Sequence, residues 1–163
     1  MPTHHNVLFL CTGNSARSIM AEALLNHKSN GAFTAYSAGS HPSGKVRPEA
    51  IQQLELAGVS TTGLRSKSWD EFAAPDAPTM DFVFTVCDNA ASEVCPVWPG
   101  HPVTAHWGVA DPVAAKGDAE AIARAWHDAF SQLDRRISLF TALPISTLER
   151  MSIQKEVEKI GKL

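Results

Sequence analysis

The chain has 163 residues, of which 44% are hydrophobic and 19% are charged, and its formal net charge at pH 7 is −3. This composition is typical of one globular domain, and the slight negative charge gives no reason to expect nucleic acid or an anionic membrane as a partner. No apolar stretch is long enough for a signal peptide or a membrane span, so we expect a cytoplasmic protein. In that compartment the three cysteines are not expected to form structural disulfides.

The first element in chain order is an apolar run at residues 6–10, which predicts a buried strand. The sequence Cys-Thr-Gly-Asn-Ser-Ala-Arg-Ser follows at positions 11–18, and a helical pattern runs from Ser18 to about Lys28. A strand, a tight loop and a helix N-terminus in this order can form a cradle of backbone N–H groups around one anion. The residues predicted to bind that anion are Thr12, Gly13, Asn14, Ser15, Ala16 and Arg17.

Cys11 stands at the start of this loop. A lone cysteine is more often an inert core residue, but here the loop amides, the helix dipole and the fixed charge of Arg17 all favour a thiolate. Ser18 can donate a hydrogen bond to the same thiolate from the first helical turn. We therefore expect Cys11 to have a depressed pKa and to act as a nucleophile toward a tetrahedral oxyanion.

Strand-like and helical patterns then alternate along the chain. Extended segments are predicted at residues 33–38, 81–86 and 103–106, and helices at residues 48–57 and 118–140. Residues 40–47 and 73–79 are rich in Pro, Gly or Ser and are predicted to be surface loops. The alternation predicts a parallel sheet covered on both faces.

A further segment follows Pro144. Ser146-Thr-Leu-Glu149 fits a capping box, and apolar residues recur as far as Leu163, which predicts one more helix. We expect residues 1–142 to form one domain and residues 143–163 a helical extension. The extension could pack on the domain or contact a partner, and the pattern does not decide between them.

Cys87 and Cys95 form a pair of cysteines outside the loop. Cys87 ends a predicted strand, and the composition between the two cysteines favours a short helix that Pro96 ends. Residues eight apart in a helix lie roughly 12 Å apart along its axis, whereas a disulfide needs Cα atoms within about 7 Å. The two thiols could therefore join only after the helix unwinds, as in a switch that relays oxidation outward.

The 11–18 segment resembles the phosphate-binding loop of low-molecular-weight protein tyrosine phosphatases and of the arsenate reductases that share their fold. The region with Cys87, Cys95-Pro96, His106-Trp-Gly108 and Asp111-Pro112 is similar to the redox segment of those reductases. The resemblance covers roughly residues 6–140. It implies an α/β flavodoxin-like three-layer sandwich with a four-stranded parallel sheet, with the site at the carboxyl end of the first strand and the C-terminal helix as an addition.

The resemblance also implies a reaction, the reduction of arsenate to arsenite. Cys11 would attack arsenate, Asp111 would protonate the departing oxygen, and Arg17 with the loop amides would bind the other oxygens. Cys87 would then attack the Cys11 sulfur and release arsenite, and Cys95 would attack Cys87 to expose a disulfide to an external reductant. The resemblance implies no tightly bound cofactor. It also implies a residual phosphatase activity.

Three details bear on the partners. Position 16 is Ala where many relatives carry a second loop cysteine, and the gap between Cys87 and Cys95 is one residue longer than in thioredoxin-coupled reductases. Thioredoxin and glutathione with glutaredoxin therefore both remain open as reductants. The polar positions that hold a potassium ion in some related reductases match Asn14, Glu22, Ser37 and Asp70.

Two other functions fit parts of this sequence pattern. A tyrosine phosphatase would use the same nucleophile, arginine and acid, but Val113-Ala114 follows Asp111-Pro112 where that family has a tyrosine pair, and hydrolysis has no need of Cys87 or Cys95. A thiol sensor for arsenite or a metal could use all three cysteines as soft ligands. That reading leaves Arg17 and the anion loop unexplained.

Overall fold

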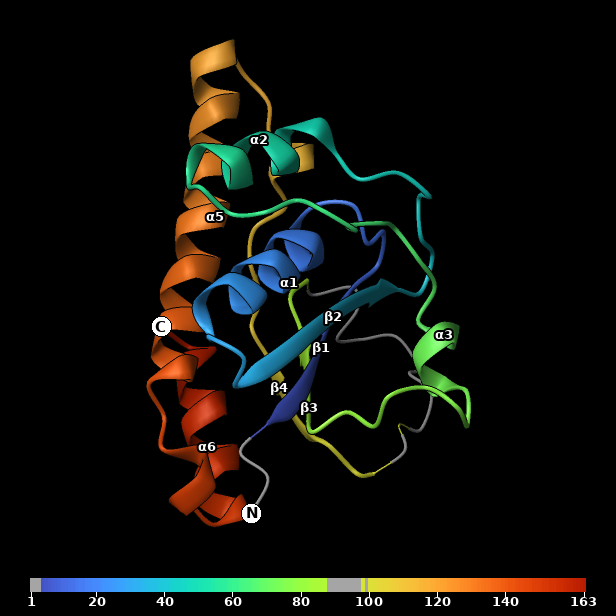
Figure 1. Cartoon of the computed structure of the whole chain (residues 1–163). Coiled ribbons are helices and arrows are strands. Elements are labelled where there is room, and N and C mark those ends of the chain that lie inside the picture. Colours follow the sequence, from blue (N-terminus) through green and yellow to red (C-terminus); the bar gives the residue numbers. More distant parts are fainter. Residues whose placement is uncertain (1–3, 88–97, 99) are drawn as a thin grey trace.

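The computed structural model describes residues 4–87, 98 and 100–163 (Figure 1). Cys95 and the short helix predicted before Pro96 lie outside the described residues. Within the described part of the chain, no helix combines the length and the apolar character that crossing a membrane requires.

A four-stranded sheet forms the centre of the molecule. Its strands are β1 (His5–Cys11), β2 (Phe33–Gly39), β3 (Phe82–Thr85) and β4 (Val103–His106), in the order β2-β1-β3-β4. All three pairings are parallel. The four apolar segments therefore form strands as predicted, and the α/β class with a parallel sheet is confirmed. Because all strands run the same way, their carboxyl ends meet at one edge of the sheet.

Helices α1 (Arg17–Lys28), α2 (Pro48–Leu56) and α5 (Ala119–Thr141) cover one face of the sheet (Figure 1). Side chains of β1 alternate between the faces, so Phe9 packs toward these helices and Leu8 packs toward the other face. The second face is covered in part by α3 (Asp70–Ala73), which was not predicted. Its single turn buries only Phe72, which is too little to give a helical period.

The C-terminal segment differs from its prediction. A short 3₁₀ turn occupies Ile145–Thr147, and α6 begins only at Arg150 and ends at Ile160. The capping box does not form, because Leu148 is extended and Glu149, the actual N-cap, makes no side-chain capping bond.

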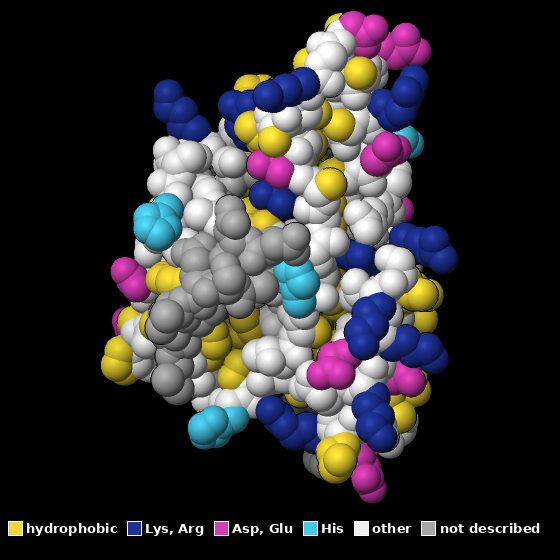
Figure 2. Space-filling view, turned by 180° about the vertical axis from the view of Figure 1, so that it is seen from behind, with side chains coloured by type: hydrophobic (Ala, Val, Ile, Leu, Met, Phe, Trp, Pro, Cys, Tyr) yellow, Lys and Arg dark blue, Asp and Glu magenta, His cyan; other side chains and the backbone are white. Residues whose placement is uncertain are grey.

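α6 packs on the domain beside β4 and α5. Its buried residues Ile153, Val157 and Ile160 belong to the main core. Gln154 Nε2 donates to Thr104 O at 2.7 Å, on the outer edge of β4. The outward face of α6 carries charged side chains of both signs (Figure 2), as expected for a helix whose other face is buried.

Candidate active site

The loop that follows β1 turns its carbonyl groups outward. Three of them accept hydrogen bonds from backbone N–H groups of the segment at 41–47, namely Thr12 O from His41 at 2.9 Å, Gly13 O from Ser43 at 3.0 Å and Ser15 O from Arg47 at 2.8 Å. Because these carbonyls point away from the loop centre, its N–H groups are left to face inward. Contacts with a distant segment thus hold the loop in a shape that could receive an anion at its centre.

Asn14 fixes the middle of the loop. It is fully buried in the left-handed region, with φ at 45°. Its Nδ2 donates to Ser18 Oγ at 2.8 Å and to Ser37 Oγ at 3.0 Å, and its Oδ1 accepts from Lys67 N at 2.8 Å. The Ser18 hydroxyl therefore already accepts a hydrogen bond, which leaves its own hydrogen to donate.

A cavity of about 180 Å³ lies inside the loop, lined by Cys11, Thr12, Gly13, Ser15, Ala16, Arg17, Asp111 and Val113. Cys11 ends β1 and is almost completely buried, and α1 starts at Arg17 without a side-chain cap from Ala16. The first N–H groups of α1 can therefore serve a bound anion. The structure brings Cys11, Arg17 and Asp111 together around a space that suits one small oxyanion.

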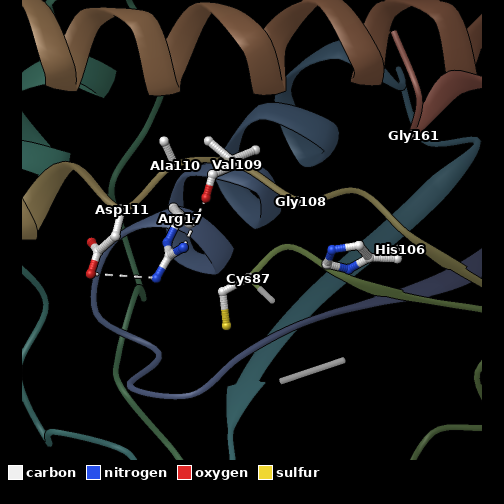
Figure 3. Close-up of a pocket in the computed structure, with 8 residues that line it drawn as sticks. All are labelled: Arg17, Cys87, His106, Gly108, Val109, Ala110, Asp111 and Gly161. Atoms are coloured by element: carbon white, nitrogen blue, oxygen red, sulfur yellow. Dashed lines mark hydrogen bonds and ion pairs between the residues drawn. The ribbon is translucent and has the colours of Figure 1, made fainter. Parts of the chain in front are cut away.

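Asp111 faces Arg17 across this space. Its Oδ2 lies 3.6 Å from Arg17 Nη2, and Arg17 Nη1 donates to Val109 O at 2.8 Å (Figure 3). The other carboxylate oxygen, Oδ1, accepts from Val113 N at 3.0 Å at the start of a 3₁₀ turn (Pro112–Ala114). The carboxyl group is thus held at the edge of the cavity, with Arg17 joining it to the loop.

Cys87 meets Cys11 directly. β1 and β3 are neighbouring parallel strands, and Val86 N donates to Leu10 O at 2.9 Å, so the residues that follow each strand lie together. The Cys11 thiol hydrogen-bonds Cys87, and Thr12 N donates to Cys87 Sγ at 3.3 Å. Both thiols are buried and reduced. Cys87 also lines a neighbouring cavity of about 590 Å³ (Figure 3).

The contact with Cys87 changes the acidity of Cys11. The hydrogen bond to Cys87 and burial raise the pKa of Cys11, while Arg17 and the Gly13 N–H lower it. The electrostatic effect of Cys87 adds to the increase. The depressed pKa expected from the loop alone is therefore wrong for this arrangement, because the hydrogen bond to Cys87 and burial outweigh Arg17 and the Gly13 N–H.

The positions expected to hold potassium surround a lysine instead. Lys67 Nζ lies 3.6 Å from Glu22 Oε1 and 3.5 Å from Ser37 Oγ, and Ser37 Oγ donates to Glu22 Oε1 at 2.5 Å. In the described part of the chain, no hydrogen bond or ion pair joins the Asp70 side chain to this group. Because an ammonium already meets the oxygens and Asn14 turns its NH₂ toward Ser37, these residues do not fit a potassium ion.

Burial acts on both charged members of this group. It raises the pKa of Glu22, which Lys67 partly offsets, and it lowers the pKa of Lys67, which Glu22 partly offsets. Sequence reasoning missed Lys67, because a buried lysine in a polar stretch has no local signal. It also missed Ser66, whose Oγ donates to Gly13 O at 3.2 Å.

Among residues 4–87, 98 and 100–163, no group of three or more His, Cys, Asp or Glu side chains could hold a metal ion. The predicted three-cysteine ligand set includes Cys95, which lies outside the described residues, as does the predicted contact between Cys87 and Cys95.

Comparison with known proteins places this site in a family. A family model described as low molecular weight phosphotyrosine protein phosphatase matches residues 6–157. A relative from Halalkalibacterium halodurans named arsenate reductase is 34% identical over 134 residues, which cover 82% of this chain and 93% of that protein.

Solved structures with a similar fold carry the same kind of name. One, described as an arsenate reductase in the phosphate binding state, aligns with a TM-score of 0.63 and 26% identity over 82% of this chain and 97% of that chain. A thioredoxin-dependent arsenate reductase from Corynebacterium glutamicum aligns with a TM-score of 0.55 and 25% identity over 83% of this chain and 63% of that chain. A match over nearly the whole chain, on a sheet and loop of this kind, shows that the chain belongs to the low molecular weight phosphotyrosine protein phosphatase family.

Proposed function

We propose that this protein is an arsenate reductase, which converts arsenate to arsenite by a thiol relay. The observation that carries this proposal is the contact between the Cys11 thiol and Cys87 beside a cavity of oxyanion size. A hydrolase needs only the first of these thiols, whereas reduction of arsenic needs a second thiol to take up the Cys11 sulfur. The name of the relative from H. halodurans agrees with this reading.

In the first step the Cys11 thiolate attacks arsenate. An S–As bond forms, an As–O bond breaks, and Asp111 gives a proton to the departing oxygen, which leaves as water. Arg17 and the inward N–H groups of the loop bind the remaining oxygens. Arsenic remains in its +5 state, so this step is the chemistry of a phosphatase on a different oxyanion.

In the second step the Cys87 thiolate attacks the Cys11 sulfur. An S–S bond forms, the S–As bond breaks and its electron pair stays on arsenic, which leaves as arsenite in the +3 state. The closeness of Cys87 to Cys11 supports this order, because the second thiol already lies beside the sulfur that it attacks. Cys95 then attacks Cys87, which frees the Cys11 thiolate and forms a Cys87–Cys95 disulfide.

The second disulfide has to be reduced by an external thiol. We propose thioredoxin as the donor, since the C. glutamicum structure is described as thioredoxin-dependent, and we treat glutathione with glutaredoxin as the competing outcome of the test. Free thiols that cycle in this way require a reducing compartment, so we propose a cytoplasmic location.

A phosphatase is the second candidate, because Cys11, Arg17 and Asp111 would serve hydrolysis equally well. The surroundings of the cavity favour the reductase. Val113 stands beside Asp111 at the cavity wall. The single tyrosine of the chain, Tyr36, packs against Phe72 with ring centroids 5.4 Å apart in the core of the other face. No tyrosine of this chain can therefore flank an aryl phosphate, and we expect slow aryl phosphate hydrolysis as a side activity.

The test measures arsenite production from arsenate by the purified protein. One set of assays supplies thioredoxin with its reductase, and the other supplies glutathione with glutaredoxin. We expect turnover with thioredoxin and its loss in Cys87→Ser, while the hydrolysis of an aryl phosphate persists in that variant. Equal phosphatase rates in both proteins, with no arsenite under either condition, would replace the reductase by the phosphatase.

A further inference from the structure

Two guanidinium groups hold the segment that carries Asp111. Arg136 Nη1, on α5, donates to Gly108 O at 2.8 Å, and Arg17 Nη1 donates to the next carbonyl, Val109 O, also at 2.8 Å. One arginine lies at the active-site cavity and the other lies in the core. Two successive peptide units just before Asp111 are therefore fixed from opposite sides.

Arg136 is buried, with only 4% of its surface exposed. Within the described residues, its Nε has no hydrogen-bond partner and no carboxylate side chain pairs with it. A buried cation of this kind costs free energy. The cost is offset by two main-chain oxygens, Gly108 O and Leu163 O, the second of which accepts from Nη2 at 3.2 Å. Arg136 thus joins the segment before Asp111 to the chain that follows α6.

α6 also contacts this segment directly. Trp107 is fully buried, stacks on Phe84 with centroids 4.1 Å apart, and donates from Nε1 to Val157 O of α6 at 2.9 Å. Gly161, just after α6, approaches so closely that a Cβ there would lie 2.3 Å from His106 O. The close approach leaves no room for the segment at 106–108 to shift toward α6.

We propose that Arg136 and α6 are positioning elements for Asp111, because they fix the path of residues 106–109 and so place the acid against Arg17. The proposal rests on the proposed function, in which Asp111 protonates the oxygen that leaves arsenate. Gly108, Gly161 and Asp111 line the same cavity beside the active site (Figure 3), so the contacts with α6 reach the site without touching arsenate.

The test is a double-mutant cycle of Arg136→Met and Asp111→Asn. We expect Arg136→Met alone to lower kcat for arsenite production by about tenfold, with the KM for arsenate within about twofold of wild type. In the Asp111→Asn background the same change should lower kcat by less than about twofold, because the acid it positions is absent. Equal losses in both backgrounds would mean that Arg136 supports only the fold, and would overturn the proposal.

A second variant approaches the segment from α6 and covers the case in which Arg136→Met does not fold. Gly161 has a φ of −64°, which alanine adopts without strain, so the effect of Gly161→Ala comes from the methyl group pressed against His106 O and the Trp107 ring. We expect a kcat loss of about threefold that is again absent in the Asp111→Asn background. Ser152→Ala, on the exposed face of α6, serves as the control and should keep wild-type kcat.

The outcomes separate the two proposals. If Asp111→Asn alone keeps wild-type kcat, the acid role in the proposed reaction fails and the positioning role fails with it. If Asp111→Asn is impaired but Gly161→Ala is not, the reaction stands and the positioning role of α6 is rejected.

Discussion

At the scale of single residues, the acidity of the buried groups depends on their neighbours. Cys87 raises the pKa of Cys11, and Glu22 and Lys67 each partly offset the effect of burial on the pKa of the other. In both pairs, burial makes an isolated charge costly, so the state of one residue depends on the presence of the other.

Removing Cys87 should therefore lower the pKa of Cys11. In Cys87→Ala the hydrogen bond and the neighbouring charge disappear, whereas Arg17 and the Gly13 N–H still favour the thiolate. We expect the rate of Cys11 alkylation by iodoacetamide to rise at pH 7 and its inflection to move to lower pH. A Cys11→Ser variant identifies the signal from Cys11. An unchanged inflection would show that Cys87 does not control the acidity of Cys11.

Removing Lys67 should destabilise the protein in a pH-dependent way. Burial raises the pKa of Glu22 in the folded protein. When a carboxyl has a higher pKa in the folded than in the unfolded chain, the folded state becomes less stable as the pH rises and the carboxyl ionises. Because Lys67 opposes this loss, we expect Lys67→Met to lower the free energy of unfolding by about 2–4 kcal/mol at pH 7.5 and by less at pH 5.

Urea denaturation at both pH values measures this effect, with Lys45→Met, at an exposed position, as the control. Equal destabilisation at the two pH values would remove Glu22 as the cause.

The wild-type melting temperature should also be the same in KCl and NaCl of equal ionic strength, since the Lys67 ammonium lies where a potassium ion was expected.

At the scale of elements, the end of β2 supports the active-site loop. The register pairs Cys11 with Gly39, and a Cβ at Gly39 would lie 2.4 Å from Thr12 O. Glycine is needed here for close approach of two backbones, not for an unusual φ. A strand that was predicted only as a segment of the sheet thus also shapes the cradle.

Gly39→Ala should therefore impair the site more than the fold. The added methyl group has to push the loop at Thr12, so we expect kcat/KM for arsenate to fall by about tenfold or more, with a loss of stability of about 1–3 kcal/mol. Ala35→Gly in the same strand should cost about 0.5–1 kcal/mol and keep the activity. Wild-type kcat/KM in Gly39→Ala would show that the loop tolerates the displacement.

At the scale of the whole molecule, the site combines residues that the chain order keeps far apart. Local patterns predicted the strands, the long helices and the loop, because continuous apolar runs and the order of strand, loop and helix are visible in the sequence. Lys67 and Arg136 could not be predicted, because the oxygens of Glu22, Ser37 and Gly108 that they contact lie more than twenty residues away. The capping box failed for a similar reason, since α6 begins where its apolar face meets β4 and α5 rather than where the local motif suggested.

The ends of β1 and β3 bring Cys11 and Cys87 together, and this contact leads to a prediction about the complete relay. Without an external reductant, each chain can supply two electrons once, so we expect about one arsenite per chain from the wild type and also from Cys95→Ser. The variant should stop with a Cys11–Cys87 disulfide, because no thiol remains to attack Cys87, whereas the wild type should stop with Cys87 joined to Cys95. Arsenic speciation counts the product, and peptide mapping under non-reducing conditions identifies the disulfide. Repeated turnover of Cys95→Ser with thioredoxin would mean that the reductant attacks Cys87 itself, which would remove Cys95 from the relay and leave the steps at Cys11 and Cys87 unchanged.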